Sequence, residues 1–206
     1  KHKKQSGGRG QYGDCHIRIA PLARGSGYEF VDSIVGGVIP NKFIPAVDKG
    51  IQEAMQRGPI AGYPCVDFRA ECFFGSYHDV DSSEQAFKMA GILAFRTVTA
   101  KARPVLLEPI TSVQVWAPSD ILGDVLGDLS PRRAQILSTE QDGRLTKVNV
   151  LIPQAELYRY STALHSITHG RGTHTERPHG YSEAPAEVTA KVAAEHKKDS
   201  PGGGEE

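Results

Sequence analysis

The sequence has no run of apolar residues that approaches the roughly 20 needed for a membrane-spanning helix. Its polar, basic N-terminus has no apolar segment of the kind found in signal peptides. Its three cysteines, Cys15, Cys65 and Cys72, form no C-x-x-C pair, which argues against a disulfide framework or a zinc site and favours reduced thiols in strands. We therefore expect a cytoplasmic protein with no membrane partner.

The chain also lacks the G-x-x-x-x-G-K-[ST] loop that binds nucleotide phosphates. Its formal net charge is zero, but residues 1–24 carry six lysines and arginines against one aspartate, whereas the last 24 residues are acidic on balance. A basic, glycine-rich start is compatible with contact to nucleic-acid phosphates, but on charge alone we favour a solvated terminus.

A length of 206 residues with 39% hydrophobic and 23% charged residues predicts a globular protein of one large or two small domains. The first 103 residues mix strand and helix patterns. We predict a flexible, glycine-rich loop at 1–14, strands at 15–20, 27–35 and 64–73, and helices at 43–57 and about 81–102.

Two of these segments have a clear period. Val47, Ile51 and Met55 recur every four residues and share one helical face. In the strand at 64–73, apolar and charged side chains alternate, so one set should face the core and the other solvent. The inward set is Val66, Phe68, Ala70 and Cys72, and the outward set is Asp67, Arg69 and Glu71.

The loop at 75–80 carries a polar and aromatic cluster in front of the second helix. Asp81 and Glu84 have capping-box spacing, so we predict that Asp81 caps this helix. His78 with Asp79 and Asp81 is also compatible with acid–base catalysis or metal binding, but no H-E-x-x-H motif supports either. A helix cap is the better interpretation of Asp81.

Residues 104–181 have a different element order. We expect strands at 110–118, 133–140, 145–152 and 172–178, and helices at 119–129 and 153–167. Ser119 is the expected N-cap of the first helix, and Gln141-Asp142-Gly143 the expected hairpin turn. The order βαββαβ is that of a ferredoxin-like domain. A further helix is expected at about 184–196, and the composition of residues 198–206 predicts a disordered tail.

Four histidines, His165, His169, His174 and His179, lie close together in the sequence. The first two are four residues apart on a predicted helix, which is compatible with a transition-metal site. We favour surface histidines at a helix end, where a positive charge suits the helix dipole.

Two loops of the first domain gain meaning when taken together. If the strands at 15–20 and 64–73 are antiparallel neighbours, the loop before the first and the loop after the second lie at one edge of the sheet. That edge would collect Arg9, Gln11, Tyr12, Tyr77 and His78. Such groups suit phosphate contact and stacking on unpaired bases, so the pattern favours a nucleic-acid-binding tip over an enzyme site.

Long motifs along the chain resemble those of bacterial elongation factor G, in that family's order. "QSGGRGQYG", "GGVIPNKFIPAVDKGIQEAM" and "GSYHDVDSSEQAFKMAG" resemble its fourth domain. "LLEPI", "DILGDVLGDLSPRRAQI" and "LHSITHGRGTHTERPHGY" resemble its fifth domain, and "EAPAEVTAKVAAE" its closing helix. The resemblance runs from about Gln5 to Glu195.

The resemblance implies an α+β protein of two domains. Residues 1–103 would form a ribosomal-protein-like α/β domain with a left-handed βαβ crossover. Residues 104–181 would form the ferredoxin-like domain, and a C-terminal helix within 182–197 would pack back on the first domain. The chain would be a monomeric C-terminal fragment without enzymatic activity and without a cofactor of its own, with GTP and magnesium bound by a missing N-terminal GTPase domain.

The resemblance also implies partners and site residues. The family's tip loops contact the tRNA–mRNA in the small-subunit decoding region during translocation, and its fifth domain lies near large-subunit rRNA and the stalk base. The tip residues implied are Gly8, Arg9, Gly10, Gln11, Tyr12, Ser76, Tyr77, His78 and Asp79. Arg132, Arg133 and Arg171 are the implied rRNA contacts of the second domain.

Some residues depart from the family pattern. Ala134 stands where glycine is usual, His165 and His169 stand where arginine and glutamine are common, and Arg159-Tyr160 is a further departure. They raise the alternative of a paralogue specialised for ribosome recycling. Two more hypotheses stay open, a free-standing RNA- or ribosome-binding module and a metal-dependent enzyme that uses His78 and the C-terminal histidines.

Overall fold

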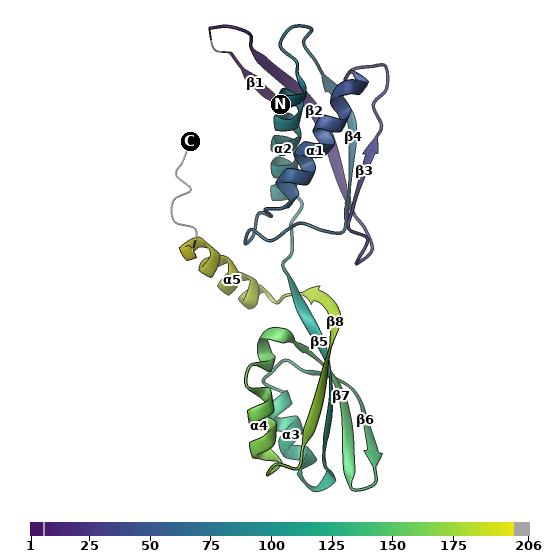
Figure 1. Cartoon of the computed structure of the whole chain (residues 1–206), viewed down its shortest axis with the longest axis vertical. Helices are drawn as coiled ribbons and strands as arrows, with labels where there is room; N and C mark the ends of the chain where they lie inside the picture. The colour runs from purple at the N-terminus through teal and green to yellow at the C-terminus, as the bar shows by residue number, and fades with distance from the viewer. Residues whose placement is uncertain (6, 200–206) are drawn as a thin grey trace. The chain divides into compact units, whose positions relative to one another are not determined.

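The computed structural model describes residues 1–5 and 7–199, which form two compact units (Figure 1). Unit 1 comprises Lys1–Val105 and the C-terminal segment from Ala186, which contains helix α5 (Ala186–Asp199). Unit 2 comprises Leu106–Pro185. Of the tail expected at 198–206, the first two residues end α5 and the rest lie outside the described residues. No helix in the described part is both long and apolar enough to cross a membrane.

Unit 1 is a four-stranded sheet with two helices against one face (Figure 1). Its elements are β1 (His2–Lys4), β2 (Gln11–Pro21), β3 (Tyr28–Asp32), a short 3-10 turn η1 (Asn41–Phe43), α1 (Ile44–Met55), β4 (Phe68–Ser76) and α2 (Glu84–Lys101). The strand order is β1-β2-β4-β3. β2 and β4 are antiparallel, whereas β3 and β4 are parallel and joined through α1.

The prediction of one flexible loop over residues 1–14 is wrong at both ends. His2–Lys4 pairs with the start of β2, and β2 begins at Gln11. Gly13 is part of the paired strand β2. It is a glycine because any side chain at this position would collide with the backbone of α2. A Cβ at Gly13 would come within 2.6 Å of the Ala86 carbonyl oxygen, so the residue lets β2 pass directly beneath α2.

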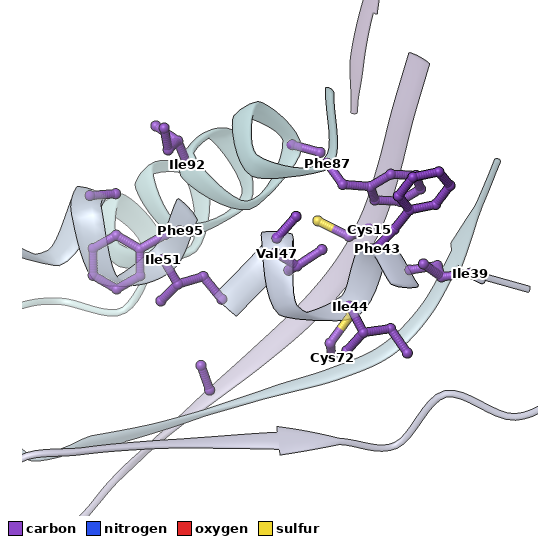
Figure 2. Close-up of a cluster of buried hydrophobic side chains, with 14 of the residues drawn as sticks. Cys15, Ile39, Phe43, Ile44, Val47, Ile51, Cys72, Phe87, Ile92 and Phe95 are labelled. Atoms are coloured by element: carbon purple, nitrogen blue, oxygen red, sulfur yellow. The ribbon is translucent and has the colours of Figure 1, made fainter. Parts of the chain in front are cut away.

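The core of unit 1 lies between the sheet and the helices (Figure 2). Val47 and Ile51 are fully buried, as the four-residue spacing predicted. The rings of Phe43 and Phe87 stack with centroids 5.0 Å apart. The cysteines are free thiols, and burial raises the pKa of Cys15 to about 12, which marks it as an inert core residue.

The strand predicted at 64–73 begins only at Phe68, and its first two assignments are wrong. Val66 is 48% exposed, whereas Asp67 is 8% exposed and has a positive φ of 60°. The carboxylate of Asp67 accepts hydrogen bonds from the backbone N–H of Gly27 at 2.9 Å and of Gly25 at 3.0 Å. These bonds, and Arg24 beside them, hold the pKa of Asp67 below its ordinary value. Asp67 therefore organises the β2–β3 loop from inside.

Unit 2 is the predicted βαββαβ domain. Its elements are β5 (Leu107–Pro118), η2 (Ser119–Ile121), α3 (Leu122–Leu129), β6 (Gln135–Asp142), β7 (Leu145–Pro153), η3 (Gln154–Leu157), α4 (Tyr160–Ile167) and β8 (Thr173–Glu183). All neighbouring strands are antiparallel, in the order β6-β7-β5-β8. Alternate residues of the central strands β5 and β7 are fully buried with Val125 and Leu129 of α3. The α+β fold class is confirmed.

Two details of unit 2 differ from the sequence prediction. Ser119 does not cap a helix; its hydroxyl lies 2.9 Å from that of Thr146 and so ties η2 to β7. The helix expected at 153–167 is divided into η3 and α4. Arg159 between them has a φ of 56°, in the left-handed region that a continuous right-handed helix excludes.

Candidate nucleic-acid interface

The loop before β2 and the loop after β4 lie side by side. Asp14 pairs with Ser76 in the antiparallel β2–β4 ladder, which places both loops at the same end of the sheet. The pairing continues beyond the ladder, because Tyr12 forms an isolated bridge with Ser82 and its N–H donates to the Asp81 carbonyl at 2.9 Å. The predicted juxtaposition is confirmed, and residues 7–12 and 76–83 are called the tip below.

Side chains fasten the two loops of the tip into one body. The Arg9 Nε donates to the Val80 carbonyl at 2.9 Å. The N–H of Gly10 donates to Asp81 Oδ1 at 3.1 Å. Ser82 Oγ donates to the Tyr12 carbonyl at 2.9 Å. Each bond joins residues that are 70 or 71 positions apart, so the tip has little freedom to open without breaking several of them.

Asp81 does not cap α2, so that prediction is wrong. The N-cap is Ser83, whose Oγ accepts the N–H of Ala86 at 3.1 Å. Asp81 instead faces the first loop. A Cβ at Gly10 would lie 2.9 Å from Asp81 Oδ2, so glycine at this position lets the backbone reach the carboxylate. Spacing along the sequence could not reveal this partner on the other loop.

His78 lies at the centre of the second loop. Its backbone N–H donates to Ser82 Oγ at 2.9 Å. Its Nδ1 accepts the backbone N–H groups of Val80 at 3.3 Å and Asp81 at 3.2 Å. A ring nitrogen that accepts cannot also carry the proton, so this geometry assigns the proton of the neutral ring to Nε2. The side chain is 55% exposed, and Nε2 has no hydrogen-bond partner within residues 1–5 and 7–199.

The other predicted tip residues divide into two groups. Ser76 is turned to its own sheet, since its Oγ lies 2.8 Å from both the Tyr12 hydroxyl and Asp14 Oδ2. The side chain of Gln11 lies 2.8 Å from His2. The remaining exposed positions are Gly8, Tyr77 and Asp79, with Tyr77 at 45% exposure. The structure therefore brings all of these residues to one end of unit 1 but leaves only some free to reach a partner.

Sequence reasoning missed Lys1. Its ammonium lies 5.0 Å from the centroid of the Tyr12 ring, a cation–π distance, and Tyr12 raises the pKa of Lys1. Lys1 was missed because strand β1 was not predicted. The pairing of Lys3 with Tyr12 brings residues 1–4 beside β2.

The metal and acid–base alternatives have no geometric support. Among the residues that the structure describes, no three His, Cys, Asp or Glu side chains are grouped as a metal site. His78 Nδ1 lies 3.7 Å from Asp81 Oδ2, which is beyond hydrogen-bond distance, so the two side chains do not form the hydrogen-bonded pair that acid–base catalysis would use. His174 packs edge-on against the Tyr160 ring and lies 3.0 Å from Glu176 Oε1, which assigns it a packing role.

The arginines predicted to contact rRNA in unit 2 are mostly bound by their own chain. Both Nη atoms of Arg133 donate to the Glu108 carboxylate, at 2.7 and 2.9 Å, and its Nε donates to Glu156 at 3.1 Å. Glu108, the larger influence, and Glu156 raise the pKa of Arg133. Arg132 donates to Asp128 at 2.9 Å and to the Glu156 carbonyl at 2.7 Å. We call these two arginines with Glu108, Asp128 and Glu156 the arginine cluster.

Arg171 differs from the arginine cluster. Its side chain is 50% exposed and lies 3.7 Å from Asp120. It lines an open hollow together with Ser119, Asp120 and Arg144. Of the three predicted contacts it is the most exposed, since the side chains of Arg132 and Arg133 are 17% and 29% exposed.

Comparison with known proteins agrees with the resemblance seen in the motifs. The family model "Elongation factor G, domain IV" matches residues 1–103, and "Elongation factor G C-terminus" matches residues 105–192. Elongation factor G of Aquifex pyrophilus is 53% identical over 195 residues, which cover 95% of this chain and 28% of that protein. A crystal structure of a Thermus thermophilus protein superposes with a TM-score of 0.81 at 45% identity, over 97% of this chain and 30% of the other.

The chain thus spans less than a third of the length of these relatives. The two family models leave only residue 104 and the last residues of the chain unmatched. The chain belongs to the elongation factor G family, of which it carries domain IV and the C-terminal domain.

Proposed function

We propose that this chain is the ribosome-contacting C-terminal part of a translation factor that hydrolyses GTP, and that its tip enters the small-subunit decoding region to promote tRNA–mRNA translocation. The chain itself carries no catalytic group in this scheme. GTP and magnesium would be bound by the part of the factor that corresponds to the remaining length of the relatives, and the factor would act in the cytoplasm.

The observation that carries the proposal is the construction of the tip. Its backbone is held by bonds between the two loops, whereas its outward groups are a cation, an aromatic ring and an imidazole N–H. RNA loops are recognised by contacts to phosphates, by stacking and by hydrogen bonds to base edges and 2′-hydroxyls. A rigid element with such groups at its end is suited to insertion between RNA strands.

Each outward group has a distinct chemical role in this proposal. The Arg9 Nη atoms remain available to a phosphate, since the bond to Val80 uses Nε. The ring of Tyr77 offers a face to an unpaired base. His78 Nε2 offers one N–H to an acceptor on RNA. Gly8 allows close approach of the backbone to phosphate.

Mechanically, the tip acts as a probe and the nucleotide-dependent part of the factor as its motor. The tip grows directly from two paired strands with a buried core behind them, so displacement of unit 1 moves the tip without deforming it. Binding energy at the tip can then bias tRNA–mRNA movement only through contacts that differ before and after the step.

For unit 2 we propose contact with large-subunit rRNA near the stalk base. Arg171 is the residue whose exposure supports this role. Arg132 and Arg133 were also predicted as rRNA contacts, but their ion pairs within the chain favour a structural role, which we propose for them instead.

The test is single-turnover translocation on ribosomes by a full-length factor containing this sequence, wild type against His78→Ala. We expect the variant to slow tRNA–mRNA movement while ribosome-stimulated GTP hydrolysis stays near the wild-type rate. Equal loss of both activities would contradict the division between probe and motor. A wild-type factor that hydrolyses GTP on ribosomes without translocation would direct the function to ribosome recycling, which can be assayed by subunit splitting.

A further inference from the structure

A β-bulge brings two aromatic side chains to the open face of the unit 1 sheet. His16 pairs with Phe74 and Ile17 pairs with Cys72, so Phe73 is an extra residue in β4. A bulge of this kind can re-aim a side chain that alternation would send to the opposite face. Both rings reach His16, with centroid distances of 6.2 Å for Phe73 and 5.3 Å for Phe74.

Two cations contact aromatic rings on this face. The Arg18 guanidinium lies 4.4 Å from the centroid of Phe73, and the Lys1 ammonium lies 5.0 Å from that of Tyr12. Tyr12, His16 and Arg18 are even-numbered positions of one strand, so their side chains share the face opposite the buried Cys15. We call Lys1, Tyr12, His16, Arg18, Phe73 and Phe74 the cation–aromatic strip.

Phe74, His16 and Arg18 are exposed members of the strip, whereas Tyr12 and Phe73 are half-buried. Phe74 is 49% exposed, and the side chains of His16 and Arg18 are 50% and 61% exposed. The helices cover the other face of the sheet, so they do not account for these rings. A contiguous group of aromatic rings that is partly exposed on a sheet face favours a binding surface.

The charges of the strip favour an anionic partner. Lys3 pairs with Tyr12 and adds a further cation on this face. Two carboxylates lie nearby: Asp14, whose Oδ1 is 3.8 Å from His16 Nε2, and Glu71, which is 3.1 Å from Arg18. The three cations Lys1, Lys3 and Arg18 outnumber them, so the local charge remains positive. An exposed pair such as Arg18–Glu71 contributes little to stability, so a phosphate can replace the carboxylate at small cost.

We propose that the cation–aromatic strip binds unpaired nucleotides of RNA, with bases stacked on His16 and Phe74 and phosphates held by Arg18, Lys1 and Lys3. The strip begins at Tyr12 within the tip and continues along the same two strands, so the proposal extends the RNA contact of the proposed function to the side of unit 1. Lysines are depleted in protein–protein interfaces, and Lys1 and Lys3 lie beside these rings, so a protein partner is the disfavoured occupant.

The test is binding of a fluorescent, single-stranded oligouridylate of about eight nucleotides to the 206-residue chain, a length within the range of known stacking sites. Phe74→Leu keeps an apolar side chain but removes the ring, and we expect it to weaken binding about fivefold or more, the lower end for loss of one stacked base. Phe74→Tyr keeps the ring and should bind within about twofold of wild type. Tyr63→Ala removes another exposed ring of unit 1, 61% exposed against 49% for Phe74, and should have no effect.

Three results would overturn the proposal: no oligouridylate binding by the wild-type chain, equal binding by Phe74→Leu, or equal loss in Tyr63→Ala. Because Phe74 is exposed, we expect its variants to keep the fold, which the methyl signals of Val47 and Ile51 in NMR spectra can verify. Loss of binding in His78→Ala but not in Phe74→Leu would assign RNA contact to the tip alone. If Phe74→Leu lost oligouridylate binding and the wild-type full-length factor did not translocate, the RNA-binding role of the strip would be supported and the proposed function would be wrong.

Discussion

The tip of unit 1 and the arginine cluster of unit 2 use charged residues in opposite ways. In the tip, one atom of Arg9 holds the neighbouring loop and the rest of the guanidinium is left over. In the cluster, all three nitrogens of Arg133 are bound by carboxylates of the same chain. An arginine in a sequence motif is therefore not by itself an RNA contact. An arginine can bind RNA only through N–H groups that are not already bonded within the chain.

The same distinction applies within the single residue His78. Its Nδ1 is used by the loop, whereas Nε2 is not used by any described part of the chain. Arg9 and His78 thus each use one nitrogen for the shape of the tip and present the rest of the side chain outward.

Breaking the bond between the two loops should have the largest effect on function. Asp81→Ala leaves the N–H of Gly10 without its acceptor and frees the first loop. Because small displacements of positioned groups are costly, we expect translocation by the full-length factor to slow on the order of tenfold to a hundredfold. Asp81→Asn keeps an acceptor oxygen and should retain most of the rate. Equal rates for Asp81→Ala and wild type would show that the tip needs no such fastening.

Removing the central arginine of the cluster should mainly affect the stability of unit 2. Arg133→Ala leaves two carboxylates without their shared partner, and the free energy of unfolding should fall by about 1–3 kcal/mol, since the group is partly exposed. Trp116, the single tryptophan, lies in β5 and reports unit 2 in denaturant titrations followed by fluorescence. The control Arg171→Ala should change stability by less than about 0.5 kcal/mol. A larger loss of stability from Arg171→Ala than from Arg133→Ala would contradict the structural role of the arginine cluster.

The two nitrogens of His78 can be tested separately. Asn places an acceptor near the position of Nδ1 and removes the outward donor, whereas Gln keeps a donor near the position of Nε2. If the outward N–H contacts RNA, His78→Asn should slow translocation about fivefold, the value of one hydrogen bond, and His78→Gln should slow it less. Full activity of His78→Asn would mean that the imidazole only shapes the loop.

Asp67 is a charged residue of unit 1 that, like Arg133 in unit 2, is bound within its own unit. Its substitution should have the smallest effect of the four, and the effect should be on stability. Its pKa is lowered in the folded state, so its contribution to stability is complete well above the ordinary value of 3.8 and is lost as the pH falls through the folded value. We expect wild type to be more stable than Asp67→Asn near neutral pH and the difference to shrink in acid. Thermal unfolding of unit 1 at several pH values would show this, and a constant difference would contradict it.

Much of the fold follows from the sequence because hydrophobic period is a local property. Val47 and Ile51 are buried as their spacing predicts, and the strand order of unit 2 follows from its βαββαβ pattern. The juxtaposition of the tip loops could be predicted as well, because antiparallel neighbours place the start of one strand beside the end of the other.

The errors arise where a distant partner decides the role of a residue. Asp81 has capping-box spacing but is bonded to Gly10, 71 positions away. Asp67 alternates with outward residues but turns inward to bind the β2–β3 loop. Sequence spacing carries no information on such contacts, and neither the bulge at Phe73 nor the pairing of Arg133 with Glu108 has a local signal.

We propose that Arg9 of the tip contacts RNA and that Arg133 of the arginine cluster does not. The most direct measurement is the salt dependence of ribosome affinity, taken from the factor-concentration dependence of translocation, for Arg9→Ala and Arg133→Lys in the full-length factor. Lys keeps the charge of Arg133 and loses its fork of hydrogen bonds. We predict that Arg9→Ala lowers affinity and reduces the salt slope by about one, as expected for one lost phosphate contact, whereas Arg133→Lys changes neither. An unchanged slope for Arg9→Ala, with a reduced slope for Arg133→Lys, would contradict the claim.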